Sequence, residues 1–253
     1  MTKKRTAFYR IYSRLWPIQR LWRWLWFRLG GKVAGGPFAG MRYRSHAVWG
    51  NPGNKLLGTY EQELFPVLMQ LDRNPPPVVF DIGASEGYYA VGLAWRWREA
   101  KTQVYAWESD PRSQALITAG SAENQVQDRI EVYGECTEAV LYEAISKLRP
   151  GLIIMDIEGA EQDVCSARCL GASGEAGSVW IVECHHPDIV ETLKARFEGR
   201  FQVEVIPNQP RTPADIRIRL PLFSAPLLND RRRLVNEGRP FPTPWIVAFP
   251  RQG

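Results

Sequence analysis

The stretch VVFDIGASEGYYAVGLA, from Val78 to Ala94, constrains the fold of this chain more than any other segment. An apolar run ends at Asp81, a short loop carries Gly83 and Gly87, and an apolar pattern at helical spacing follows. Glycine lets the backbone turn sharply and lie close to a ligand, because it has no Cβ. The segment therefore predicts a strand, a tight turn and a helix N-terminus, an arrangement that binds nucleotide-like molecules.

The loop residues indicate which molecule that is. A dinucleotide fingerprint needs G-x-G-x-x-G, whereas this loop reads G-A-S-E-G and has no middle glycine. Glu86 would also bring a carboxylate against a pyrophosphate, which is unfavourable. S-adenosylmethionine (SAM) carries no phosphate, and its ammonium group suits an acidic loop. We therefore expect SAM as the cofactor, with an ordinary structural turn as the alternative. The residues predicted to bind it here are Asp81, Gly83, Ala84, Ser85, Glu86 and Gly87.

A second acidic residue follows at a suitable distance. TQVYAWESD, from Thr102 to Asp110, reads as the next strand and ends near Glu108. Glu108 lies 21 residues after Gly87, close to the roughly 20-residue spacing at which an acidic residue meets ribose hydroxyls. Glu108 and the adjacent Ser109 are thus predicted to bind the cofactor. A solvated carboxylate at a strand end is the alternative.

Two further motifs suggest a family. LIIMDIEGAEQDV (Leu152 to Val164) predicts a buried strand ending at Asp156, and WIVECHHPD (Trp180 to Asp188) predicts another. Together with the D-I-G-A-x-x-G-Y-Y string, they closely resemble the FkbM-type methyltransferases, a branch of the Rossmann-like SAM-dependent enzymes. The resemblance covers about Thr59 to His186. Glu86 departs from it, since many relatives carry an apolar residue there.

The order of elements predicts an α/β fold. Strands alternate with helical patterns, which gives a parallel, doubly wound sheet. The resemblance implies the class I methyltransferase fold, a mostly parallel seven-stranded sheet with helices on both faces and an antiparallel last strand. Before the sheet, Thr59 is the expected N-cap of a helix that Pro66 kinks or splits. Strands are predicted near 77–81, 103–108, 129–134, 151–156, 179–184, 201–207 and 244–250.

One domain over 55–253 suits a chain of 253 residues. An arginine- and proline-rich insertion at about 208–243 contains DRRRLVNEGRPFPTP. We expect it either to cover the cleft and contact an anionic acceptor, or to be a solvated surface loop.

Candidate catalytic residues follow the fourth and fifth strands. Methylation of a hydroxyl needs a general base or a metal ion to remove the proton. Asp156 is predicted to orient acceptor or cofactor, and His185 to act as base because neutral imidazole accepts a proton near pH 7. His185 occupies the histidine position of the family-like E-x-H string that begins at Glu183. A period-2 strand sends His186 to the opposite face, and a structural histidine is the alternative role. Glu158 and Glu183 complete the predicted catalytic set.

The acidic residues that follow the fourth and fifth predicted strands could also bind a metal ion. Asp156, Glu158, Glu161, Glu183 and His185 form a plausible oxygen-rich cation site. Acids in a first helical turn are, however, stabilised by the helix dipole without binding anything, and no metal is predicted. By analogy of fold, adenine is expected near Glu135 and Cys136.

Charge is concentrated at the N-terminus. Residues 1–32 contain nine Lys or Arg and no acid, which leaves 23 basic and 27 acidic residues in the rest of the chain. A nucleic-acid methyltransferase would more often be basic around its catalytic site too. A nucleic acid is therefore an unfavoured partner.

Residues 1–35 form a basic, tryptophan-rich segment with an expected amphipathic helix from Pro17 to about Leu29. Its longest apolar run, Trp24 to Phe27, is too short to cross a membrane. We expect residues 1–32 to contact an anionic membrane peripherally, while packing on the protein itself is the alternative. Trp24 and Phe27 lie on the basic side. On a helical wheel the apolar side holds Ile18, Leu21, Trp22, Leu25 and Leu29, and the basic side holds Arg20, Arg23 and Arg28.

The sequence thus predicts a SAM-dependent O-methyltransferase for a hydroxyl of a saccharide, glycolipid or small natural product. N-methylation, RNA methylation and a non-catalytic cofactor-binding or membrane-associated module are the alternatives. The four cysteines form no disulfide framework, so a cytoplasmic location is expected, with the inner face of the membrane as the contact site. The oligomeric state is not predicted.

Overall fold

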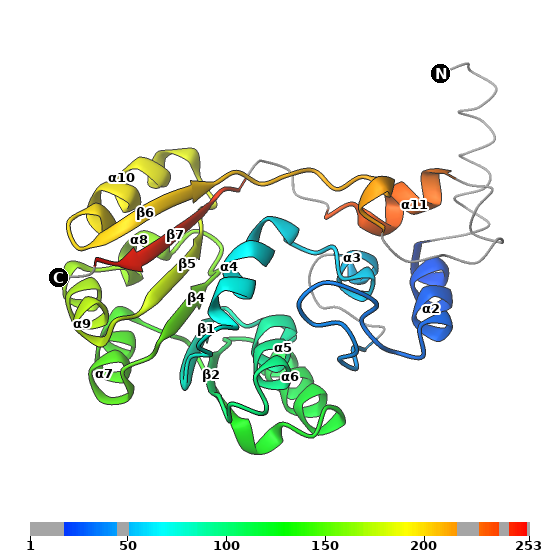
Figure 1. The fold of residues 1–253 in the computed structure, drawn as a ribbon, viewed down its shortest axis with the longest axis horizontal. Coiled ribbons are helices and arrows are strands. Elements are labelled where there is room, and N and C mark those ends of the chain that lie inside the picture. The colour runs from blue at the N-terminus through cyan, green and yellow to red at the C-terminus, as the bar shows by residue number, and fades with distance from the viewer. Residues whose placement is uncertain (1–17, 45–50, 217–227, 238–242, 252–253) are drawn as a thin grey trace. The chain divides into compact units, whose positions relative to one another are not determined.

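The computed structural model describes residues 18–44, 51–216, 228–237 and 243–251 (Figure 1). Contacts divide the chain into two compact units. One comprises Glu61–Gln209 with Arg239–Gly253 and contains the whole sheet. The other comprises Met1–Tyr60 with Pro210–Gly238. We call them the sheet unit and the N-terminal unit.

The sheet unit contains seven strands in the order β3-β2-β1-β4-β5-β7-β6. Neighbouring strands from β3 to β5 run parallel, whereas β7 is antiparallel to both of its neighbours, β5 and β6. The predicted strands and the antiparallel last strand are therefore confirmed. The strands are β1 Val78–Ile82, β2 Gln103–Trp107, β3 Ile130–Tyr133, β4 Leu152–Met155, β5 Val179–Glu183, β6 Phe201–Ile206 and β7 Trp245–Pro250.

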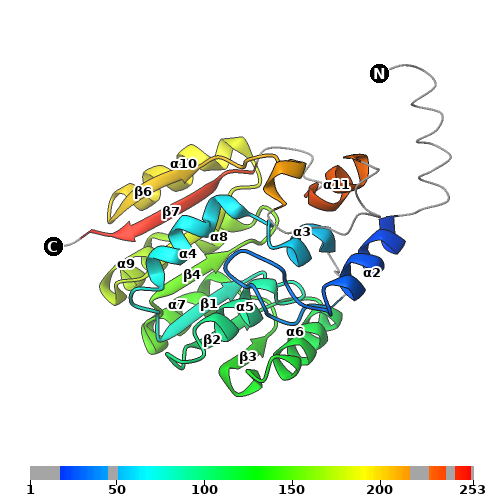
Figure 2. The ribbon, with the colours of Figure 1, turned by 45° about the vertical axis from the view of Figure 1, so that its right-hand side comes forward.

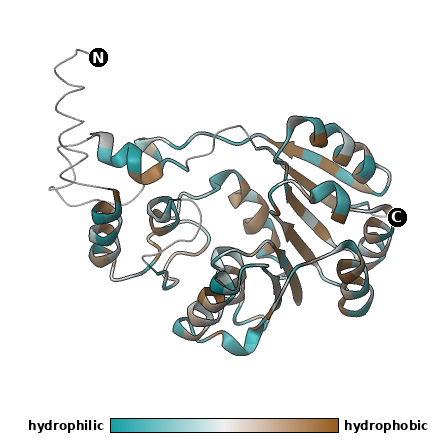
Figure 3. Ribbon diagram, turned by 180° about the vertical axis from the view of Figure 1, so that it is seen from behind, coloured by the Kyte–Doolittle hydropathy of each residue, from teal (hydrophilic) through white to brown (hydrophobic). Residues whose placement is uncertain are grey.

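Helices cover both faces of this sheet (Figures 1 and 2). Alternate residues of a strand point to opposite faces, and Phe80 and Ile82 of β1 pack with Leu141 of α7 and Phe197 of α10 in one core cluster. The central strands β4 and β5 are buried at every position, as expected where helices cover both faces. The edge strands β3 and β6 alternate between apolar and exposed polar residues, and the outer helix surfaces are polar (Figure 3). The helices are η1 Gln62–Leu64, α4 Phe65–Leu71, α5 Tyr88–Arg96, α6 Pro111–Glu123, η2 Gln127–Arg129, α7 Glu138–Leu148, α8 Glu161–Val164, α9 Ala167–Ala176 and α10 Pro187–Glu198.

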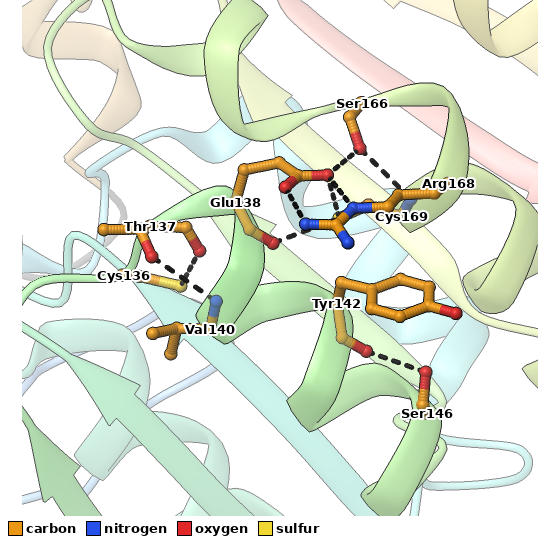
Figure 4. Close-up of polar contacts among 9 residues, drawn as sticks. All are labelled: Cys136, Thr137, Glu138, Val140, Tyr142, Ser146, Ser166, Arg168 and Cys169. Carbon is orange, nitrogen blue, oxygen red and sulfur yellow. Dashed lines mark hydrogen bonds and ion pairs between the residues drawn. The ribbon is translucent and has the colours of Figure 1, made fainter.

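Polar side chains join α7 to α9 (Figure 4). Glu138, in the first turn of α7, forms an ion pair with Arg168 and accepts a hydrogen bond from the hydroxyl of Ser166, the N-cap of α9. The Arg168 guanidinium also lies 4.6 Å from the centre of the Tyr142 ring. The hydrogen bonds from Arg168 lower the pKa of Glu138 to about 2, so this carboxylate is ionised at neutral pH.

The expected N-cap at Thr59 is wrong. The Thr59 backbone N–H donates to the carbonyl of Asn54, so this residue follows the end of α3 (Pro52–Leu57) instead of starting a helix. α4 begins at Phe65, and Pro66 lies in its first turn, where proline needs no N–H acceptor. The expected split at Pro66 is confirmed, because η1 ends immediately before α4.

In the N-terminal unit, α2 (Ile18–Arg28) and α3 pack with η3 (Pro213–Asp215) and α11 (Leu228–Val235). The Asn51 side-chain amide donates to the carbonyls of Arg233 and Asn236, at 2.7 and 2.8 Å. Leu234 is fully buried, so this part of the insertion is a folded helix and not a solvated loop. Pro17, the expected helix start, lies outside the described residues.

Candidate functional site

The candidate site lies where β1 and β4 end. The strand order reverses between these two neighbours, and ligands of open α/β sheets bind outside the carboxyl ends of the strands at such a point. Gly83 follows β1 with φ +82°, and a Cβ there would lie 1.7 Å from the backbone oxygen of Asp156. Glycine is therefore required for the β1 loop to contact the segment that follows β4.

The loop after β1 has few N–H groups left for a phosphate. Gly83 and Ala84 both donate to the carbonyl of Trp107, and Gly87 donates to Ala84. Ser85, with φ +50°, donates its N–H to Glu108 at 2.7 Å. A phosphate-binding loop directs these groups at its ligand. Here they stabilise the loop itself, which agrees with the interpretation that the loop does not bind a dinucleotide.

Glu108 connects the loops that follow β1 and β2. One carboxylate oxygen accepts from Ser85, and the other accepts from the backbone N–H of Asp110 at 2.8 Å. Each carboxylate oxygen has a second lone pair, so the group retains acceptor capacity for hydroxyls. Glu108 is half-buried and Ser109 is exposed.

Asp81 is buried beneath this loop. Its carboxylate accepts the backbone N–H of Ala90 in the first turn of α5, so it fixes the helix start against β1. Burial, together with the nearby charges of Asp156, Glu108 and Glu61, raises the pKa of Asp81 to about 7. Several carboxylates therefore meet at this edge, which favours a cationic ligand.

His185 lies among three carboxylates just beyond β5. Its Nδ1 is 2.9 Å from Oε1 of Glu161, and its Nε2 is 3.4 Å from Asp156 and 3.3 Å from Glu158. The His185 side chain is 15% exposed, enough to leave one edge of the ring accessible. The structure thus brings together three of the four predicted catalytic residues.

Glu161 positions the histidine. Its side chain is fully buried, and Oε1 also accepts from the backbone N–H of Gly159 at 3.1 Å. Burial acts to raise the pKa of Glu161, but the hydrogen bonds from His185 and Gly159 lower it overall. Burial acts to lower the pKa of His185, and the hydrogen bond and charge of Glu161, with Asp156 and Glu158, raise it overall.

Glu158 is held in a strained backbone. Its φ is +57°, which non-glycine residues rarely adopt and which is concentrated at functional sites. Glu158 precedes the first turn of α8, so the alternative role as a helix-dipole acid is wrong for this residue. Its side chain is 79% exposed and is available to a ligand.

The remaining predicted residues lie around this centre. Glu86 is buried and accepts a 2.7 Å hydrogen bond from the Ser85 hydroxyl. Glu183 ends β5 and is also buried. Glu135 is exposed after β3, whereas burial raises the pKa of Cys136 to about 12. His186 is exposed, and a Cβ on Gly159 would lie 3.6 Å from its Nε2.

Two residues of the site lie outside the predicted set. The sequence predicts Glu161 only as a cation ligand or as an acid stabilised by the helix dipole. The D-x-E-G-x-E spacing was the signal that could have placed it beside Asp156 and Glu158. Glu61 accepts a 2.6 Å hydrogen bond from the Tyr89 hydroxyl and is fully buried. Nothing in its local sequence indicates that it approaches Asp81.

The cluster also has the dimensions of a cation site. Within the part of the chain that the structure describes, one ligand atom each from Asp156, Glu158 and His185 lies within 4.8 Å of the others. Such a mixed nitrogen and oxygen set could hold a divalent cation. Cys165, Cys169 and Cys184 are buried in the core, where a free cysteine packs as a small apolar side chain.

The comparisons with known proteins identify the fold. No protein-family model and no curated protein sequence matches the chain. A SAM-dependent O-methyltransferase from Thermotoga maritima matches at TM-score 0.50 and 14% identity, over 77% of this chain and 67% of that one. An O-methyltransferase from Bacillus cereus in complex with SAH matches at TM-score 0.52 and 11% identity, over 76% and 81%.

A cofactor-bound protein from MTB, Rv0187, matches at TM-score 0.51 and 13% identity, over 77% of this chain and 81% of that one. At these identities the likeness is one of fold. The chain has the Rossmann-like class I methyltransferase fold, as predicted. Among the described residues, no helix is both long and apolar enough to cross a membrane.

Proposed function

We propose that this chain is a SAM-dependent O-methyltransferase. The observation that carries the proposal is a glycine loop whose N–H groups bond to the protein, surrounded by Asp81, Glu108 and Asp156. This environment suits a cofactor with a sulfonium and an ammonium group and opposes one with phosphates. Asp81, Glu108 and the loop would hold SAM, with adenine near Glu135 and Cys136.

His185 is the proposed proton acceptor. With Nδ1–H donated to Glu161, its Nε2, which faces Asp156 and Glu158, would take the proton of an acceptor hydroxyl as the oxygen attacks. The resulting imidazolium is stabilised by Glu161, Asp156 and Glu158. When bound, SAM supplies the electrophilic methyl group. Asp156, next to both the loop and His185, would orient the acceptor.

The acceptor is proposed to be a hydroxyl of a saccharide, glycolipid or small natural product. This rests on the resemblance of the D-I-E-G-A-E and E-x-H strings to the FkbM-type enzymes. Outside residues 1–32 the chain has more acidic than basic residues, which opposes RNA as the acceptor. A cytoplasmic location is part of the proposal, since the four cysteines are free.

The test is transfer of labelled methyl groups from SAM to pools of saccharides, lipids and RNA, with and without EDTA. We expect label in the saccharide or lipid pool and no effect of EDTA, because His185 is the proton acceptor. Label found only in RNA would contradict the proposed acceptor class. Loss of methyl transfer in EDTA would contradict the proposal that His185, without a metal ion, accepts the proton. Absence of transfer to every pool despite SAM binding would indicate a non-catalytic module.

A further inference from the structure

One side of α2 is already used inside the protein. Leu21 and Leu25 are 3% and 0% exposed, and α2 packs against α3 and α11 of the same unit (Figure 2). These leucines belong to the apolar side that the sequence offers to a membrane. In the folded chain that side is covered, so it is not available to a lipid surface.

The opposite side of α2 is basic and carries an exposed aromatic ring. Phe27 is 79% exposed, the largest exposure among the large apolar side chains that the structure describes. Residues three or four positions apart are neighbours on a helix, so Arg23 lies one turn before Phe27, and Arg20 lies one turn earlier still. Arg20 and Arg23 are both exposed. Arg28 is exposed too, but it lies seven positions after Leu21 and three after Leu25 and therefore belongs to the side of the buried leucines.

We propose that the face of α2 formed by Arg20, Arg23 and Phe27 binds the surface of a membrane that contains anionic lipids. Arginines bind headgroup phosphates, and an aromatic ring between them enters the interface. An 11-residue helix lies in the plane of the membrane, because about 20 residues are needed to cross it. Phe27, the exposed aromatic residue on the basic side, is thus the residue that inserts into the membrane interface.

The charge of the N-terminal segment indicates which partner this face of α2 binds. Residues 1–32 carry nine basic residues and no acid, whereas the rest of the chain carries 23 basic and 27 acidic residues. A locally basic patch on an otherwise acidic chain suits an anionic surface approached from one side. A nucleic acid could also use arginine and phenylalanine, and it is an outcome of the test.

The test is flotation of the full chain with vesicles of phosphatidylcholine, with or without phosphatidylglycerol. We expect binding only with phosphatidylglycerol, and loss of that binding at high salt. R20Q/R23Q is expected to weaken binding roughly 30-fold, and F27S roughly tenfold. R73Q/K147Q and M69S are matched controls, since these residues are exposed elsewhere, and they should bind as wild type.

Equal binding to both vesicle types, or an equal loss in the control variants, would overturn the proposal. Binding to single-stranded RNA without binding to either vesicle would also overturn it and assign the face to nucleic acid. The proposal is separate from the proposed function, because SAM affinity should be unchanged in all these variants. Circular-dichroism melting curves establish that each variant is folded.

Discussion

At the scale of single residues, the site depends on how His185 is held. Its Nδ1 faces a buried glutamate while its Nε2 faces the carboxylates of Asp156 and Glu158. A base needs a fixed tautomer and a stabilised conjugate acid, and Glu161 would supply both to His185 in the proposed role. His186, one residue later, is exposed and provides an internal comparison.

His185→Gln should lower kcat by about 10²- to 10⁴-fold, the usual contribution of a general base. SAM affinity should be nearly unchanged, because His185 is not assigned to the cofactor. The measurements are steady-state kinetics and a SAM titration. His186→Gln is the matched control, and equal losses in the two variants would contradict the role of His185.

The rate should depend on pH through the same ring. The base must be neutral to accept a proton, and its pKa is raised above the ordinary 6.5. We therefore expect kcat to be low where His185 is protonated and to rise with pH through this raised pKa. Glu161→Gln removes a hydrogen-bonded charge and should move the midpoint to lower pH. An unchanged midpoint in the pH profile of kcat would mean that Glu161 does not act through His185.

Asp156 and His185 could be predicted as site residues from the sequence, because each follows a predicted strand. Glu161 could not be predicted as the partner of His185, since its burial depends on the path of the chain after β4. Glu61 lies 20 residues before Asp81 in the sequence, and only the tertiary fold brings their charges together.

At the scale of elements, the turn between β1 and α5 depends on Gly83. A side chain there would meet the backbone oxygen of Asp156, and backbone cannot move aside as a flexible side chain can. Gly177, at the end of α9, has a similar φ of +76° but no atom within 4 Å of a Cβ. The two glycines therefore separate the cost of a clash from the cost of the conformation.

Gly177→Ala should lower the free energy of unfolding by about 1 kcal/mol, the cost of the left-handed conformation. Gly83→Ala should lower it by about 3 kcal/mol or more, because the clash adds to that cost. Urea denaturation of both variants measures the difference. If they are equally destabilised, Gly83 is not required for contact with the segment after β4.

The strands were the elements best predicted from sequence. A sheet covered on both faces needs apolar residues at nearly every strand position, and such runs are visible locally. The side of α2 that stays exposed could not be predicted from the sequence. It depends on which side α3 and α11 cover.

At the scale of the whole molecule, the strand order places three carboxylates around a loop whose N–H groups bond to the protein. The same loop in a dinucleotide enzyme directs its N–H groups at phosphate. This edge of the sheet therefore suits a ligand with positive charge and not one with phosphates. A fold with this strand order supports many functions, so the ligand has to be identified by measuring binding.

The most direct test is calorimetric titration of the full chain with SAM and, separately, with NAD. We expect that SAM binds at one site, that NAD does not bind, and that Glu108→Gln weakens SAM binding about tenfold or more. Glu99→Gln, at an exposed acid outside the site, should bind as wild type. Binding of NAD, or no binding of SAM, would show that this loop does not select SAM.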